Sequence, residues 1–260
     1  MNFVFISPNF PESYFQFPKA LKNNGVHVFG VGDCPYDDLK EELKQSLDEY
    51  YKVSSLENYD EVYKAVAYFT FKHGRIDYSE ANNEYWLMQD AQLRTDFNIN
   101  TGVKNDVIDF IKYKSKMKEL YAKAGIKTAR YHLCDTLENA LKFIDEVGYP
   151  LVVKPDNGVG ASATYKLKTI DDVKTFYETY DGEHQYIMEE FVDGDLISFD
   201  GIANSKREPL FATSHVFPEQ IMDVVNDVTD MHYYVVKALE LVKPEVAGAY
   251  KDYRGYKQRF

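Results

Sequence analysis

Apolar residues in about the first hundred positions follow two alternating spacings. Short, mostly apolar runs are typical of buried strands, and they predict strands at residues 2–6, 26–30, 50–53 and 76–78. Between these runs, apolar residues recur three or four positions apart, which predicts helices at residues 14–22, 36–47 and 58–74. This alternation of strands and helices predicts a parallel sheet covered on both faces, a Rossmann-like α/β layer arrangement.

The pattern changes from about residue 106 onward. Lysines crowd one periodic segment, and residues that cap helices precede two others, so we expect helices at residues 108–124, 136–148 and 170–180. Apolar runs between them predict strands at residues 129–133, 151–154, 165–167 and 186–192. The second and third of these strands form a hairpin with a mobile, glycine-bearing tip at 157–164. We interpret the chain as three domains, at residues 1–106, 107–185 and 186–260.

Composition narrows the classes of partner. The net charge of −12 repels phosphates of nucleic acids and anionic membrane surfaces, so we expect neither as a partner. A small anion can still bind where lysines and backbone N–H groups converge. Cys34 and Cys134 form no CxxC or Cys/His pattern, which disfavours a disulfide framework or a zinc site and fits the cytoplasm.

The turn after the first predicted strand reads Ser-Pro-Asn-Phe-Pro at residues 7–11. It lacks the glycines that allow a backbone to approach a pyrophosphate closely. The sequence therefore argues against a nicotinamide-dependent dehydrogenase.

A candidate phosphate site begins at Lys154, which ends an apolar strand directly before the glycine-bearing loop. Gly158 and Gly160 permit a close backbone approach, while Ser162 and Thr164 add hydroxyl donors. Taken alone, the same stretch is more often an ordinary hairpin turn with a solvated lysine at its edge.

The order of these features resembles the ATP-grasp family. A lysine-bearing helix, a strand ending Val-Val-Lys-Pro, a glycine-rich hairpin, a helix and the run Met-Glu-Glu-Phe-Val-Asp-Gly at 188–194 follow one another. The resemblance implies that Lys114 and Lys154 contact nucleotide phosphates, with Lys112 and Lys116 as alternatives for the first lysine. It assigns the contacts to adenine to Glu189, Glu190, Phe191 and Val192. The carboxylate that usually accepts the ribose hydroxyls falls close to Leu196, so Asp195 is its nearest replacement.

Residues 83–86 and 89–94 also resemble the helix that leads toward the lid in carboxylate-amine ligases. The fold implied is a Rossmann-like pre-ATP-grasp domain followed by an ATP-grasp domain with a mobile α+β lid. The activity implied is that of an ATP-dependent ligase that uses Mg²⁺ and activates a carboxylate as an acyl phosphate for attack by an amine or similar nucleophile. Its partners would be small-molecule carboxylate and nucleophile substrates. The alternatives are a non-catalytic nucleotide-binding module and, third, a purely structural interaction domain.

The resemblance fades after Phe211, where the acidic residues do not form the Glu-x-Asn-x-Arg element of the family. The sequence therefore names no catalytic residue and no Mg²⁺ ligand, and we expect the C-terminal part to be short or truncated. A homodimer that completes the site in trans stays open. His215 and His232 offer a general base or a carboxylate contact, although a histidine without a role is the plainer interpretation. Arg94 either binds substrate or pairs locally with Asp90 or Asp96.

Overall fold

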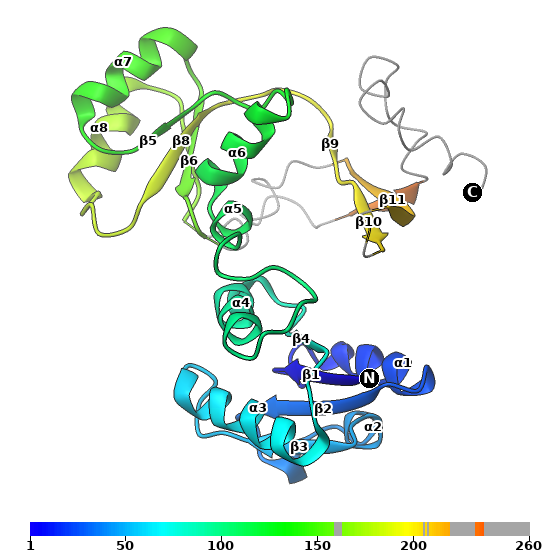
Figure 1. The fold of residues 1–260 in the computed structure, drawn as a ribbon. Coiled ribbons are helices and arrows are strands. Elements are labelled where there is room, and N and C mark those ends of the chain that lie inside the picture. The colour runs from blue at the N-terminus through cyan, green and yellow to red at the C-terminus, as the bar shows by residue number, and fades with distance from the viewer. Residues whose placement is uncertain (159–162, 205, 207, 219–231, 237–260) are drawn as a thin grey trace. The chain divides into compact units, whose positions relative to one another are not determined.

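The computed structural model describes residues 1–158, 163–204, 206, 208–218 and 232–236, and it divides the chain into two compact units (Figure 1). The first unit is Met1–Thr128 and the second is Ala129–Phe260. Each is described by itself below. Of the predicted site residues, Gly160 and Ser162 lie outside the described residues. The division into three domains stays a prediction.

The first unit is built on a parallel sheet, as its hydrophobic pattern predicts. Its strands are β1 (Asn2–Ile6), β2 (His27–Gly32), β3 (Glu49–Lys52) and β4 (Tyr78–Glu80). They lie side by side in the order β3-β2-β1-β4, with every neighbouring pair parallel. The sheet order places the first two βα loops and the segment after β4 at one edge of the sheet.

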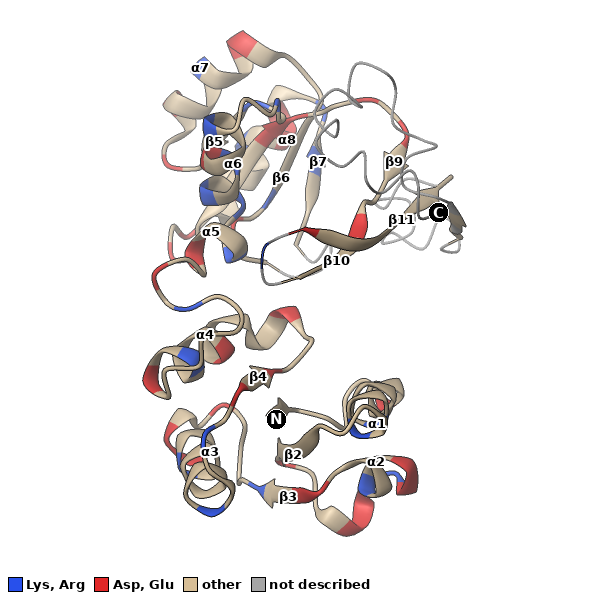
Figure 2. Cartoon of the chain, turned by 45° about the vertical axis from the view of Figure 1, so that its right-hand side comes forward, with Lys and Arg blue, Asp and Glu red and all other residues tan. Residues whose placement is uncertain are grey.

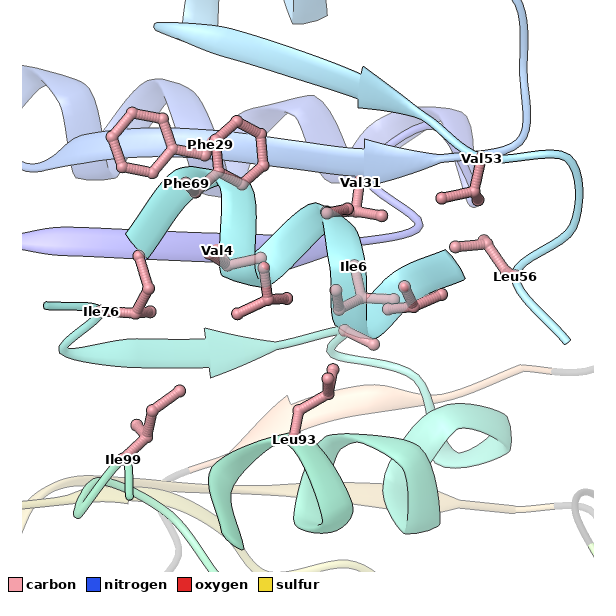
Figure 3. Close-up of a cluster of buried hydrophobic side chains, with 14 residues drawn as sticks. Val4, Ile6, Phe29, Val31, Val53, Leu56, Phe69, Ile76, Leu93 and Ile99 are labelled. Atoms are coloured by element: carbon pink, nitrogen blue, oxygen red, sulfur yellow. The ribbon is translucent and has the colours of Figure 1, made fainter. Parts of the chain in front are cut away.

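Helices cover both faces of this sheet. They are α1 (Gln16–Asn23), α2 (Glu41–Ser46), α3 (Tyr59–His73) and α4 (Leu87–Asp96). On one face, the predicted apolar stripe of α3 packs with Val4, Ile6 and Phe29 in a buried cluster (Figure 3). On the other, Leu43 of α2 packs with Phe3, Phe5 and Val28. The predicted Rossmann-like layering is therefore confirmed.

Two predicted helices in this unit are broken. The helix expected at 36–47 is a short 3₁₀ turn, Tyr36–Asp38, followed by α2, because Leu39 between them is extended and buried in the core. The helix expected at 108–124 is split at Tyr113 into α5 (Asp109–Lys112) and α6 (Lys114–Lys123). Tyr113 is extended, at φ −92° and ψ 123°. Across the break, Lys116 pairs with Asp109, seven residues earlier, which is farther than the i,i+4 spacing of side-chain pairs on a straight helix. Lys116 also lies over the Tyr113 ring.

Arg94 is buried and plays a structural part. Its guanidinium pairs with Glu80 at 2.6 Å and donates hydrogen bonds to the carbonyl oxygens of Ser79 and Val103. Asp96, one of its expected partners, instead accepts a hydrogen bond from Tyr59 at 2.6 Å. The substrate-binding alternative for Arg94 is therefore not supported, since its donors are spent on β4 and the segment after α4.

The second unit begins with an antiparallel sheet, which we call the lid sheet. Its strands are β5 (Tyr131–Leu133), β6 (Leu151–Pro155), β7 (Tyr165–Leu167) and β8 (Tyr186–Glu190), in the order β5-β8-β6-β7. Two helices, α7 (Leu137–Val147) and α8 (Ile170–Thr179), pack their apolar residues against one face of it. Thr136 caps α7 and Thr169 forms a capping box with Asp172 at α8, as the sequence predicts.

A third, antiparallel sheet follows in the second unit. It consists of β9 (Leu196–Ile197), β10 (Asp200–Ala203), β11 (Pro209–Phe217) and β12 (Tyr234–Val236). β11 lies at its centre and pairs with the other three strands. The hydrophobic pattern did not predict these strands. In the described part of the chain, no helix combines the length and the apolar character needed to cross a membrane.

Candidate nucleotide-binding site

Strand register brings the predicted phosphate and adenine residues of the lid sheet onto one face. Val152 lies directly opposite Glu189 on one side and Lys166 on the other. Directly opposed residues share a face, as do residues two apart, so Lys154 joins them. We call this surface the Lys154 face; it comprises Tyr131, Leu133, Val152, Lys154, Lys166, Ile187 and Glu189. The opposite face carries Leu151, Val153 and Met188 and is covered by α7 and α8.

The ammonium group of Lys154 lies against the neighbouring strand. Its Nζ is 2.5 Å from Oε2 of Glu189, whose side chain is only 9% exposed against 28% for Lys154. The ion pair therefore crosses between β6 and β8, and it fixes the lysine on the Lys154 face. An anion that approaches this face would share the ammonium with a carboxylate that is already in place.

Lys166 is a basic residue of this face that the sequence analysis missed. Its Nζ lies 3.7 Å from the centre of the Phe191 ring, which is a close cation–π contact. Figure 2 shows basic positions on both β6 and β7. The signal was available in principle, because antiparallel pairing of the two hairpin strands puts Lys166 opposite Val152, two positions before Lys154.

Glu190 is held by Arg130, another residue that the sequence analysis did not single out. One carboxylate oxygen of Glu190 accepts the backbone N–H of Arg130 at 2.7 Å, and the other pairs with its guanidinium at 2.6 and 2.7 Å. Glu190 holds the pKa of Arg130 above its usual range. Because Glu190 faces the other way from Glu189, its carboxylate fixes the end of β8 and the start of β5.

The predicted adenine segment begins in β8 and continues past its end. The strand ends at Glu190, two residues earlier than predicted. The N–H of Phe191 still donates to the carbonyl oxygen of Pro150 at 3.3 Å, but Pro150 has no N–H to return a bond, so the ladder stops there. Phe191 is half-buried beside Lys166, and Val192 is 66% exposed. Asp195 is also exposed, and it directly precedes β9.

The described part of the glycine loop explains Gly158. A Cβ atom at this position would lie 2.9 Å from Cβ of Pro155, closer than side chains tolerate. The turn after β6 therefore requires glycine here for steric reasons. In the described part of the loop, Ala163 has a left-handed backbone conformation, at φ +51°.

The three candidate lysines of the first unit differ in their surroundings. Lys112 lies 3.7 Å from Glu84, and Lys116 pairs with Asp109. Lys114 is the first residue of α6 and follows the break at Tyr113. The structure thus brings together Lys154, Glu189, Lys166 and Phe191 within the second unit, while the roles of Lys114 and Asp195 stay predictions.

Within the described ranges, the group of three side chains that lie close enough to hold a metal ion is Asp181, Glu183 and His184. All three are exposed and lie in the turn between α8 and β8. We assign no metal to this turn.

The family of the domain follows from comparison with known proteins. The ATP-grasp (A) domain of phosphoribosylglycinamide synthetase matches residues 112–223, which contain the whole lid sheet and the Lys154 face. Residues 112–223 are therefore an ATP-grasp domain. The matched range begins at Lys112, so α6 and Lys114 belong to the ATP-grasp part together with the second unit.

Relatives and solved ATP-grasp structures agree with this assignment. The phosphoribosylamine–glycine ligase of Lactococcus lactis subsp. lactis is 33% identical over 102 residues, which are 37% of this chain and 24% of that protein. Phosphoribosylglycinamide synthetase from Anaerococcus prevotii shares the fold with a TM-score of 0.60 and 17% identity, covering 84% of this chain and 52% of that one. The biotin carboxylase domain of the Hydrogenobacter thermophilus 2-oxoglutarate carboxylase, solved with MgADP and bicarbonate, has a TM-score of 0.69 and 16% identity. It covers 96% of this chain and 56% of that one. The chain thus spans about half of those solved chains, and about a quarter or less of the first curated relatives.

Proposed function

We propose that this ATP-grasp protein binds ATP with Mg²⁺ on the Lys154 face and uses it to activate a carboxylate as an acyl phosphate, which an amine or similar nucleophile then attacks. The observation that carries the proposal is the Lys154–Glu189 ion pair beside Lys166 and Phe191. It supplies two ammonium groups and an aromatic ring on the face of the lid sheet that α7 and α8 leave uncovered. The matched family domain and the MgADP in the biotin carboxylase structure support the same ligand.

The two ammonium groups suit different parts of a nucleotide. Lys154 would donate to phosphate oxygens, a role that the family resemblance also gives to Lys114. Phe191 offers a flat apolar surface for the adenine ring, which Lys166 already covers from one side. The extended backbone from Glu190 to Val192 alternates carbonyl and N–H groups, which match the donor and acceptor of the adenine edge. Asp195 would accept the ribose hydroxyls.

Magnesium would arrive with the nucleotide, because it prefers oxygen ligands and is commonly held by phosphates and one or two carboxylates. Its chemistry is to neutralise charge on the phosphates during transfer. We assign it no protein ligand. Glu189 is the buried carboxylate of the Lys154 face, and its oxygen is already bonded to Lys154.

The lysines and the hairpin have different roles in the proposed reaction. The ammonium groups neutralise phosphate charge as it shifts during transfer, and the hairpin of β6 and β7 closes over the acyl phosphate and keeps water from hydrolysing it. A small-molecule carboxylate and a nucleophile would complete the site. We also propose that the protein forms a homodimer.

Calorimetry with MgATP on the full chain tests the binding step. Lys154→Ala should weaken affinity by about 1–3 kcal/mol, the range for losing a charge-assisted hydrogen bond. Lys142→Ala is the matched control, since Lys142 is a 66% exposed lysine on α7 that pairs only with Glu138 among its described contacts. Equal affinities for the two variants would contradict the assignment of Lys154.

Turnover tests the ligase step. ADP release that depends on both a carboxylate and an amine, screened over panels of amino acids and simple carboxylic acids, is the expected result. Nucleotide binding with no carboxylate-dependent ADP release across the panels would instead favour the non-catalytic nucleotide-binding module.

A further inference from the structure

Strands β9, β10 and β11 gather three polar side chains on one face of the third sheet. Asp200 lies directly opposite Thr213, and Ile197 lies opposite Val216, in one continuous antiparallel register. The same register sets Ser198 opposite His215, and the N–H of Ser198 donates to the carbonyl oxygen of His215 at 2.9 Å. Ser198, Asp200 and His215 therefore share a face, because they alternate with Ile197, Gly201 and Ser214 along their strands.

The hydrogen bonds among these three side chains fix the protons. The Ser198 hydroxyl lies 2.5 Å from Oδ2 of Asp200 and donates to it, since a carboxylate has no proton to give. Nδ1 of His215 lies 2.8 Å from the same Oδ2 and 3.1 Å from the Ser198 oxygen. Only a protonated Nδ1 makes both contacts attractive. The Ser198 oxygen also accepts the backbone N–H of His215 at 3.1 Å, which holds the ring in place.

With its proton on Nδ1, the neutral ring of His215 carries its lone pair on Nε2. Nε2 has no hydrogen-bond partner among the described residues, and the side chain is 29% exposed. Tyr233 packs edge-on against the ring, with centroids 5.1 Å apart. Ser198 contacts Nδ1 instead of Nε2, so the histidine is not arranged to activate this serine as a nucleophile.

We infer that His215 accepts the proton lost by the amine nucleophile of the proposed ligase, with Asp200 and Ser198 as positioning residues. This inference rests on the proposed function. As the amine nitrogen attacks the acyl phosphate, a C–N bond forms and the C–O bond to phosphorus-bound oxygen breaks. Phosphate leaves with that electron pair. The proton shed by the nitrogen passes to Nε2 and from there to the departing phosphate or to solvent.

Asp200 is suited to its part. Hydrogen bonds from Ser198 and His215 lower its pKa, so it stays an anion that faces the imidazolium formed by the transfer. The lone pair of Nε2 and the anionic Asp200 lie on opposite sides of the ring, which is the arrangement that a directed proton acceptor needs.

The tautomer can be tested on the full chain without any substrate. Long-range ¹⁵N–¹H spectra should show Nδ1 protonated and Nε2 bare in the neutral ring of His215. Asp200→Asn should move the proton to Nε2, because the amide can donate to Nδ1. A native ring protonated on Nε2 would overturn the inference, whatever the catalytic results.

Separate measurement of the two half-reactions tests the role in catalysis. The first is carboxylate-dependent scrambling of ¹⁸O between the bridge and nonbridge positions of ATP, and the second is amide formation. We expect His215→Ala to keep the scrambling while amide formation falls by about 10²–10⁴-fold. Added imidazole should restore amide formation in proportion to its concentration. His184→Ala, a change at an exposed histidine in the turn before β8, is the matched control and should alter neither.

The outcomes separate this inference from the proposed function. Loss of both half-reactions together, or of neither, in His215→Ala would overturn the role of His215 while leaving the ligase intact. Native protein that shows neither half-reaction would remove the proposed function and the base with it, and the spectra would then report only on the geometry of the ring.

Discussion

Two ion pairs with a well-buried member behave differently in this protein. In the first unit, Arg94 is 2% exposed and its donors are divided among Glu80 and two backbone carbonyl groups. In the second, Lys154 is 28% exposed and bonds a single carboxylate, Glu189. An ammonium has three donors, so Lys154 keeps capacity that the guanidinium has already used. A structural charge therefore differs from a charge suited to a ligand in how many of its hydrogen-bond donors are already used, more than in how deeply it is buried.

The largest effect should come from breaking the structural pair. Arg94→Met removes the buried cation that pairs with Glu80 and its hydrogen bonds to the carbonyl oxygens of Ser79 and Val103, so we expect a loss of about 3–5 kcal/mol in the free energy of unfolding. Urea denaturation measures it. The folded fraction should bind MgATP as well as the native protein does; a loss of affinity with full stability would instead make Arg94 a binding residue.

The same region predicts a pH dependence of stability. Burial, followed by the nearby charge of Glu80, raises the pKa of Asp90 to about 8. The unfolded carboxyl releases its proton near pH 4, whereas the folded one keeps it, so the native state binds more protons between pH 4 and 8. Stability should therefore fall as pH rises through that window, by at most about 1.4 kcal/mol per pH unit for one proton, and level off above it.

Asp90→Asn should remove this decline, since the amide oxygen can still accept the N–H of Ala81 that Asp90 binds at 3.0 Å. Chemical denaturation at several pH values is the measurement. Asp145→Asn, at an exposed carboxylate on α7, is the control and should leave the slope unchanged. A slope that survives in Asp90→Asn would show that another group holds the proton.

The pair on the Lys154 face should separate stability from binding. Lys154→Ala removes the ion-pair partner of the largely buried Glu189 carboxylate, which should cost about 1–3 kcal/mol of stability. Adding Glu189→Gln removes the buried charge of this carboxylate and should restore much of the stability without restoring MgATP affinity. If the double variant regained affinity as well, the phosphate contact would not belong to Lys154.

The smallest effect should come from Lys166. Its replacement by Met keeps an apolar stem but removes the cation above Phe191, a contact worth about 0.5–1 kcal/mol at an exposed site. We expect MgATP affinity to fall by several-fold, while the free energy of unfolding falls by no more than the value of this contact. An unchanged affinity would confine Lys166 to packing against the ring.

Local patterns predicted much of the fold. The apolar stripe of α3 and the caps at Thr136 and Thr169 are set by near neighbours in the chain, so they could be seen in advance. The breaks at Leu39 and Tyr113 could not be seen in advance. At Leu39, tertiary packing overrides a helical spacing, because this residue packs with Phe3, Phe5 and Val28, which no local window includes.

The candidate site divides in the same way. Lys154 and Glu189 stand in recognisable motifs, and their positions follow from the ends of two strands. Lys166, Arg130 and the partners of His215 depend on which strand lies beside which, and in what register. Ser198 meets His215 only because β9 and β11 pair antiparallel seventeen residues apart, and no motif announces such a pairing.

Val152 lies between Glu189 and Lys166 in the lid sheet. The alternation of side chains along the strands therefore decides which residues can contact a ligand. One side of this small sheet packs against α7 and α8, and the other carries Lys154, Lys166 and Glu189 beside the buried Ile187. For protein engineering, this makes the lid separable. Residues 152, 154, 166 and 189 can be exchanged to recognise another ligand while the aliphatic side that holds α7 and α8 is left untouched, provided that no insertion shifts either strand by one residue.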